Sequence, residues 1–194
     1  MATVAETTTR RYEGVEFPVA GTWALDPTHT RVDFEARHLM VAKVKGHFGG
    51  AEGALVIGAD PTQSTAQVTI ATATIDTGVE QRDQHLKSPD FLEVEAHPEI
   101  VFTSGSFEHV QDGDWRLHGD LTLHGVTRPV TLKTEYNGVA IDPWGGTRAF
   151  FSATTKFDRE EWGLSWNVAL ETGGWLVGKE IKVAIEVEAV LQQD

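Results

Sequence analysis

Apolar and polar residues alternate along most of this chain from Gly21 onward. The alternation is clearest over residues 181–190, where Ile and Val occupy most odd positions and Lys, Ala or Glu follow them. A period of two residues is typical of a β-strand that buries one face, because successive side chains point to opposite sides of the sheet. We therefore predict a C-terminal strand with one apolar face and one largely charged face.

A second alternating run, residues 115–123, is followed at once by Gly125 and by a return run that ends at Tyr136. The short connection predicts a tight turn between antiparallel strands, and so a meander. With about eight such runs and few helices, the pattern predicts an all-β closed antiparallel barrel, whose interior either fills with side chains or holds one ligand. The remaining predicted strands cover residues 32–38, 47–57, 66–75, 99–109 and 147–157.

The best helical stretch is residues 80–87, which lie between two predicted strands. Ser88 and Pro89 end it, because the residue before proline is disfavoured in a helix. Ionisable residues gathered in a connection are more often functional than those scattered along strands. The surrounding segment, residues 75–92, is the most charge-dense connection and carries Arg82, Asp83, His85 and Lys87.

Composition limits the possible partners. The chain has 194 residues, which suits one domain, with 16 basic and 29 acidic residues and a formal net charge of −13. A strongly acidic protein repels nucleic acid phosphates and anionic membrane surfaces, so we expect no nucleic acid partner. Cysteine is absent from the sequence, which excludes disulfides, thiolate metal sites and a cysteine nucleophile.

Residues 1–20 are polar and rich in Thr and Glu, and they show neither strand alternation nor a helical face. We predict a flexible N-terminal tail over residues 1–20, whose deletion costs little stability, and a barrel domain over residues 21–194. The alternative is a strap laid over the domain. The chain shows no signal-peptide pattern and no run of roughly 18 apolar residues, so we expect a cytoplasmic protein without stable membrane insertion.

Several motifs occur in a fixed order, and together they resemble the YceI family of lipocalin-like, polyisoprenoid-binding proteins. The resemblance runs from about Gly21 to Leu191, with Thr30 standing where the family usually has Ser. The motifs that carry it are Asp26 with His29, the run RDQHLKSPDFL at residues 82–92, P-x-I-x-F at residues 98–102, LTLHGVTRP at residues 121–129, and Arg159 with Trp162 and Gly163.

The resemblance implies a lipocalin-like eight-stranded antiparallel β-barrel with one short helix. It also implies binding of a long-chain isoprenoid or similar amphipathic lipid, of the isoprenoid quinone or polyprenyl phosphate type, in the barrel interior. Such a protein would act as a carrier, store or chaperone, without catalysis and without a cofactor. Two alternatives stay open: an enzyme or stress-response factor acting on an isoprenoid quinone or its precursor, with His85 and Asp83 as acid and base, and a solid-barrel interaction protein.

A lipid ligand needs polar partners for its head and apolar walls for its tail. The head-group candidates are Arg82, His85, Arg159 and Asp83, because arginine is suited to bidentate contact with an anion. Each arginine could instead pair with a nearby acid, and Asp83 could cap the short helix. The predicted tail-lining residues are Phe34, Phe48, Val68, Ile70, Phe102, Leu121, Leu123, Phe151 and Trp162, although Trp162 could instead seal one end of the barrel with Trp166 and Trp175.

Eight histidines raise the question of a metal site. His118 and His124 share a strand face but lie about 20 Å apart on strand geometry, so they cannot hold one ion together. We therefore predict no metal site, and leave open one assembled from distant residues such as His38 and His85. Asp26 and His29 are interpreted as parts of an Asx-type turn. The sequence has no G-x-S-x-G, G-x-G-x-x-G or P-loop motif, and it leaves a homodimer possible.

Overall fold

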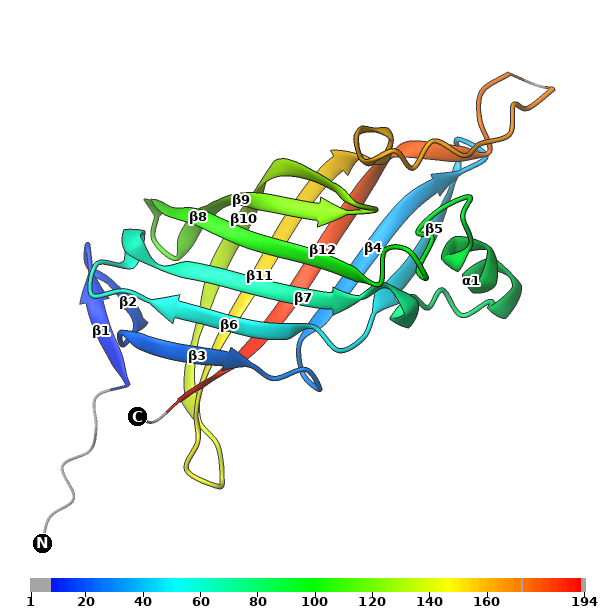
Figure 1. Ribbon diagram of the computed structural model, residues 1–194. Helices are drawn as coiled ribbons and strands as arrows, with labels where there is room; N and C mark the ends of the chain where they lie inside the picture. The colour runs from blue at the N-terminus through cyan, green and yellow to red at the C-terminus, as the bar shows by residue number, and fades with distance from the viewer. Residues whose placement is uncertain (1–7, 172, 193–194) are drawn as a thin grey trace, which may run out of the picture.

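The computed structural model describes residues 8–171 and 173–192 and shows a closed antiparallel barrel (Figure 1). Strand pairing runs once around the barrel and closes where the last two strands pair. This confirms the predicted all-β, eight-stranded, lipocalin-like fold. The strands of the ring, in spatial order, are β3 (Gly21–Leu25), β6 (Glu52–Ile57), β7 (Thr65–Ala71), β8 (Glu99–Gln111), β9 (Asp114–Leu123), β10 (Val126–Ile141), β11 (Thr147–Asp158) and β12 (Val177–Leu191).

Two further strands extend the wall of the barrel. β4 (Arg31–His38) continues the edge of β12 beyond β3, and β5 (Ala42–Phe48) pairs with β4. The prediction of one strand over residues 47–57 is wrong, because the chain breaks between β5 and β6, where Gly50 has a φ of +63°. Glycine populates this left-handed region at low cost, so it permits the bend.

The charge-dense segment follows β7 along the chain and contacts β5 through an isolated β-bridge. After the short 3₁₀ helix η2 (Thr72–Thr74), Asp76 exchanges two backbone hydrogen bonds of 2.9 Å with His47 of β5. The segment then forms α1 (Glu80–Lys87), as the sequence predicts. In Figure 1, α1 lies at one end of the barrel and the N-terminal strands lie at the other.

The prediction of a flexible, strand-free tail does not fit residues 8–20. Within them β1 (Thr9–Tyr12) and β2 (Val15–Pro18) form an antiparallel hairpin, while residues 1–7 lie outside the described residues. Phe17 of β2 is only 2% exposed, and its ring lies 4.8 Å from that of Trp115. The hairpin therefore packs as a strap, the other interpretation of this region, and its core contacts come from residues far away in sequence.

Two more 3₁₀ helices complete the structure, η1 (Pro61–Gln63) and η3 (Arg159–Trp162). Helix η3 begins where β11 ends, and Asp158 caps it by accepting a hydrogen bond from the backbone N–H of Glu160. Within residues 8–171 and 173–192, no helix has the length and apolar character needed to cross a membrane.

Candidate functional site

The interior of the barrel holds a cavity of about 260 Å³, slightly below the roughly 300–1,000 Å³ usual for small-molecule sites. Its wall consists of the inward-facing side chains of the strands, and nearly all of them are apolar. Leu86, Phe91 and Leu92 of the charge-dense segment also line it. The wall includes all but one of the predicted tail-lining residues: Phe34, Phe48, Val68, Ile70, Phe102, Leu121, Leu123 and Phe151.

Trp162 is the exception among the predicted tail-lining residues. It is 1% exposed and packs against Phe157 with a ring separation of 4.7 Å, outside the cavity wall. Its indole N–H donates to the backbone carbonyl of Leu121 over 3.1 Å, which satisfies its polar atom. Trp162 therefore fixes η3 against β9 and is part of the buried core, not of the cavity wall.

Arg82 and Asp83 hold the charge-dense segment in place. The Asp83 carboxylate accepts hydrogen bonds from the backbone N–H of Thr77, at 2.9 Å, and from its hydroxyl. Arg82 donates from Nε to the Thr77 hydroxyl at 2.7 Å and from Nη2 to the Thr77 carbonyl at 2.9 Å. Neither side chain lines the cavity. Their observed contacts tie α1 to Thr77, which precedes the N-cap residue Val79, so Asp83 has a structural role but does not cap the helix.

His85 lies on the outer side of the same segment. Its Nε2 is 2.9 Å from a carboxylate oxygen of Asp90, and its ring packs edge-on against Phe91 and Trp166. His85 and Asp83 thus contact different partners. The structure does not bring them together as the acid–base pair that the enzyme alternative requires.

Arg159 is the one predicted head-group residue that lines the cavity. It is 2% exposed, and it donates to the carbonyls of Gly178, Leu164 and Trp166. Burial lowers the pKa of its guanidinium, although the nearby carboxylates of Glu160 and Asp158 oppose this. Within the described chain, no carboxylate forms an ion pair with Arg159.

The side chain of Arg159 lines the cavity, but the wall exposes no polar atom to the interior. A guanidinium has five N–H bonds on three nitrogens. In Arg159 each nitrogen donates one hydrogen bond to a backbone carbonyl, which leaves two N–H bonds without a backbone partner. A buried cation without a paired acid favours an anion or a strong hydrogen-bond acceptor next to it. The exposed surface of the cavity wall is therefore apolar, and the guanidinium of Arg159 lies next to it with its three nitrogens bound to backbone carbonyls.

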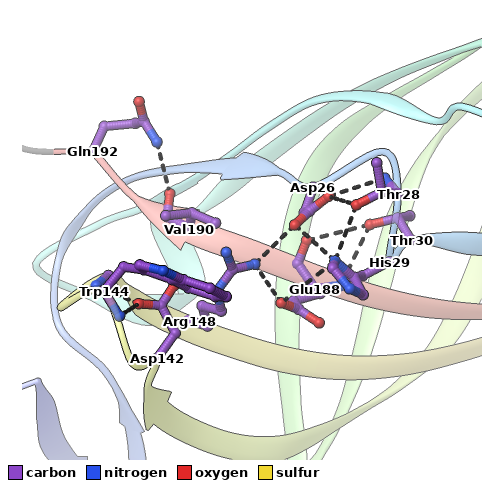
Figure 2. Close-up of polar contacts among 11 residues, drawn as sticks. Asp26, Thr28, His29, Thr30, Asp142, Trp144, Arg148, Glu188, Val190 and Gln192 are labelled. Carbon is purple, nitrogen blue, oxygen red and sulfur yellow. Dashed lines mark hydrogen bonds and ion pairs between the residues drawn. The ribbon is translucent and has the colours of Figure 1, made fainter.

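A second polar group, here named the Arg148 cluster, lies where the β3–β4 turn meets the β10–β11 turn (Figure 2). Its members are Asp26, His29, Asp142, Arg148 and Glu188. Arg148 donates to Asp26 at 2.8 Å, to Asp142 at 2.7 Å and to Glu188. Asp26 also contacts His29 at 2.9 Å. The short connection between Asp26 and His29 is thus a turn, as predicted, and it is tied to β11 and β12.

Hydrogen bonding shifts the ionisation of this cluster. The hydroxyl of Thr28, then His29 and Arg148, lower the pKa of Asp26 far below its usual value. Asp142 first, then Asp26 and Glu188, raise the pKa of Arg148. Asp26 likewise raises the pKa of His29. Each shift favours the charged form, so the cluster is a network of ion pairs centred on Arg148.

A larger groove of about 1,010 Å³ lies on the outer face of the sheet. Charged residues of both signs occur around it, including Asp33, Lys133 and Lys182. Water solvates such a surface well, so it offers an apolar chain little gain on transfer. The enclosed cavity, with its apolar wall, is the site that suits a lipid.

An antiparallel barrel around an enclosed apolar cavity defines the lipocalin-like class of ligand-binding barrels. The YceI-like domain model matches residues 23–189, and the chain belongs to the YceI family. A UPF0312 protein of Pseudomonas putida F1 is 36% identical over 166 residues, which cover 85% of this chain and 83% of the relative. A UPF0312 protein of Staphylococcus aureus USA300 is 37% identical over 171 residues, covering 86% and 95%.

Solved structures share the barrel. The YCEI protein of Campylobacter jejuni is 27% identical, with a TM-score of 0.68 over 81% of this chain and 90% of that chain. BcnA of Burkholderia cenocepacia is similar in fold alone, at 18% identity and a TM-score of 0.72 over 84% and 98%. So is a domain of Saccharophagus degradans described as polyisoprenoid binding, at 14% identity and a TM-score of 0.67 over 88% and 98%.

Proposed function

We propose that this protein binds a long-chain isoprenoid or similar amphipathic lipid inside its barrel, as a carrier, store or chaperone. The observation that carries the proposal is the enclosed apolar cavity with a single buried guanidinium, Arg159, in its wall. The description of the S. degradans domain as polyisoprenoid binding supports the choice of ligand class. A cavity of about 260 Å³ does not fit the solid-barrel alternative.

The tail contributes most of the binding free energy in this proposal. Apolar surface gains roughly 25 cal/mol for each Å² removed from water, and a prenyl chain is apolar along its whole length. Aromatic residues of the wall, among them Phe34, Phe102 and Phe151, lie on different strands and surround the cavity. The tail therefore occupies the barrel interior.

Arg159 supplies the head-group contact. Its unused N–H groups can bind a phosphate or a quinone carbonyl in a low-dielectric environment, where charge-assisted hydrogen bonds are strong. Arg82, Asp83 and His85 contribute indirectly, because they hold the segment that presents Leu86 to the cavity. The bound head would thus lie between η3 and α1.

The direct test is native mass spectrometry of the purified protein, followed by identification of any co-purifying lipid. Ala153 faces the cavity and is 6% exposed, so Ala153→Leu should reduce lipid content severalfold by filling the interior. Thr154→Leu, at the next and outward-facing position, should leave lipid content unchanged. Equal lipid content in the two folded variants would place the lipid outside the barrel.

The head-group assignment needs its own comparison. Arg159→Gln should weaken binding of a polyprenyl phosphate about tenfold, in line with roughly 1.5–3 kcal/mol for one charge-assisted hydrogen bond, and leave a head-less prenyl hydrocarbon unaffected. Arg82→Gln removes a guanidinium outside the cavity and should change neither affinity. A loss in Arg82→Gln alone would assign the head group to the charge-dense segment instead.

A further inference from the structure

Three side chains outside the lipid site converge at the end of the barrel that carries α1. We name Glu93, His97 and His124 the Glu93 cluster; each offers one ligand atom, and these atoms lie within 4.8 Å of one another. Glu93 Oε2 is 3.8 Å from His97 Nε2 and 3.7 Å from His124 Nε2. These distances are too long for hydrogen bonds. They are short enough for all three atoms to reach one ion.

The backbone places Glu93 and His97 on one side of a single turn. The carbonyl of Glu93 accepts a hydrogen bond of 2.9 Å from the N–H of His97, and residues four apart in such a turn are neighbours. The carbonyl of His97 in turn accepts from the hydroxyl of Thr72, which is fully buried, over 2.7 Å. The loop is therefore anchored to the barrel wall.

His124 lies in the tight turn between β9 and β10, and a contact between its second ring nitrogen and the backbone of η3 orients the ring. Its Nδ1 lies 3.3 Å from the carbonyl of Trp162. A carbonyl can only accept, so Nδ1 carries the proton and Nε2 keeps its lone pair. This Nε2 is buried and has no hydrogen-bond partner within the described chain. Metal-binding histidines are commonly oriented in this way, by donating their other N–H to a carbonyl.

Gly125 provides the space that the cluster needs. It has a φ of +72°, and a Cβ at this position would come within 2.8 Å of His97 Cε1. The absence of a side chain lets the rings of His97 and His124 approach to a centroid distance of 4.7 Å. Turn and loop are thus shaped to bring these imidazoles together.

We propose that the Glu93 cluster binds one divalent transition-metal ion, with Zn²⁺ as the probe. Two histidines and one glutamate form a known zinc ligand set that leaves a fourth position open. Metal–ligand bonds of about 2.0–2.2 Å imply tetrahedral ligand–ligand distances of about 3.4 Å. The two carboxylate–imidazole distances, 3.7 and 3.8 Å, are a few tenths of an ångström longer, and the two imidazole ligand atoms lie within 4.8 Å of each other. Glu93 is 40% and His97 29% exposed, so an ion can enter from solvent.

This proposal goes beyond the expectation from sequence, which considered His118 with His124 and predicted no metal site. Neither of the two candidate groups found within the described chain contains His38 or His85. The other group, Asp26 with His29 and Glu188, already surrounds the guanidinium of Arg148. Arg148 already occupies the cation position between Asp26 and Glu188, so the ion is assigned to the Glu93 cluster.

Isothermal titration of chelator-treated full-length protein with Zn²⁺ tests the proposal. Wild type should bind one ion per chain, and Glu93→Gln and His97→Ala should each weaken binding at least about tenfold. His118→Ala removes a histidine of β9 outside the cluster and should bind as wild type does. His29→Ala serves as a second control for the Arg148 cluster. The absence of saturable binding to wild type, or an equal loss in His118→Ala, would overturn the proposal.

Two further readouts keep the test decisive. Co²⁺ bound at the cluster should give the visible absorption of a four-coordinate nitrogen–oxygen site, and Glu93→Gln should abolish it. Circular dichroism checks the fold of each variant. If His97→Ala fails to fold, the isosteric Glu93→Gln decides the question by itself. Lipid content, measured on the same samples, should not change, which separates this site from the proposed lipid function.

Discussion

The Arg148 cluster and the Glu93 cluster contain the same kinds of side chain but differ in one component. Each joins carboxylate and imidazole groups whose ligand atoms lie within 4.8 Å. In the first, Arg148 supplies a built-in cation and its bonds to Asp26 and Asp142 are 2.7–2.8 Å long. In the second, Glu93 pairs only with two histidines within the described chain, at 3.7–3.8 Å.

The difference separates a structural network from a candidate binding site. An acid that already has an internal cation gains little from an external one, whereas converging ligand atoms without a shared cation can accept one. Residue type and proximity are therefore insufficient to recognise a site. The presence or absence of a cation bound between the acids distinguishes the two groups.

Arg148→Met should have the largest effect on stability. The substitution leaves Asp26, Asp142 and Glu188 without their shared cation, in side chains that are 11% (Asp142) to 16% (Glu188) exposed. We expect a loss of about 2 kcal/mol in the free energy of unfolding, measured by urea denaturation. Arg116→Met removes an exposed pair with Glu108, where both side chains are about half exposed, and should cost much less. Equal losses would mean that the Arg148 cluster is an ordinary surface network.

Gly125→Ala should affect the other cluster. The backbone at φ +72° is unfavourable for alanine, and the new Cβ collides with the His97 ring. We expect a loss of about 1–2 kcal/mol in stability and a Zn²⁺ affinity at least about tenfold lower. Gly14→Ala is the matched control, because Gly14 has a φ of +88° in a hairpin turn and open space around it. It should cost a similar backbone strain and leave Zn²⁺ binding intact.

Asp26→Asn should change how stability depends on pH. Because the folded-state pKa of Asp26 is lowered, its contribution is complete above the unfolded value of roughly 3.9 and is lost as the pH falls below it. We expect a cost of about 1 kcal/mol at neutral pH after solvent screening, and a shallower loss of stability in acid than in wild type. Urea unfolding across an acidic pH series measures both. An unchanged acid slope would contradict this role for Asp26.

His29→Ala should have the smallest effect. The raised pKa of His29 means that its contribution is present below the unfolded value of roughly 6.5 and disappears as the pH rises through the folded-state value. The side chain is 60% exposed, so the contribution is small. A slight fall in melting temperature at about pH 5, and none in alkaline buffer, is the expected result. A larger loss in alkaline buffer would reverse this assignment.

The barrel could be predicted from sequence because its signal is local. Strands with one buried face alternate visibly, as residues 181–190 do, and the tight turn at Gly125 joins two of them. Most of the tail-lining residues followed from the same alternation and from aromatic positions within the alternating runs. Successive side chains of a strand point to opposite faces of the sheet, so the alternation of apolar and polar residues in the sequence shows which of them face inward.

The parts that escaped prediction depend on contacts between distant segments. Phe17 is buried by Trp115 and by other aromatic residues that lie far along the chain, so the N-terminal hairpin gave no local signal. The Glu93 cluster joins a Glu-x-x-x-His turn to a hairpin tip. That spacing was visible, but the approach of His124 was not. Only tertiary structure distinguishes Arg82, bonded to Thr77, from Arg159 at the cavity.

The enclosed cavity also has a thermodynamic consequence. Core substitutions that leave an apolar cavity cost about 24 cal/mol for each Å³ left unfilled, and on that scale a volume of about 260 Å³ corresponds to on the order of 6 kcal/mol. This is comparable to the whole stability of many domains, roughly 5–15 kcal/mol. An occupant that fills the barrel would remove much of that cost. The melting temperature of this protein should therefore report how much of the population is loaded.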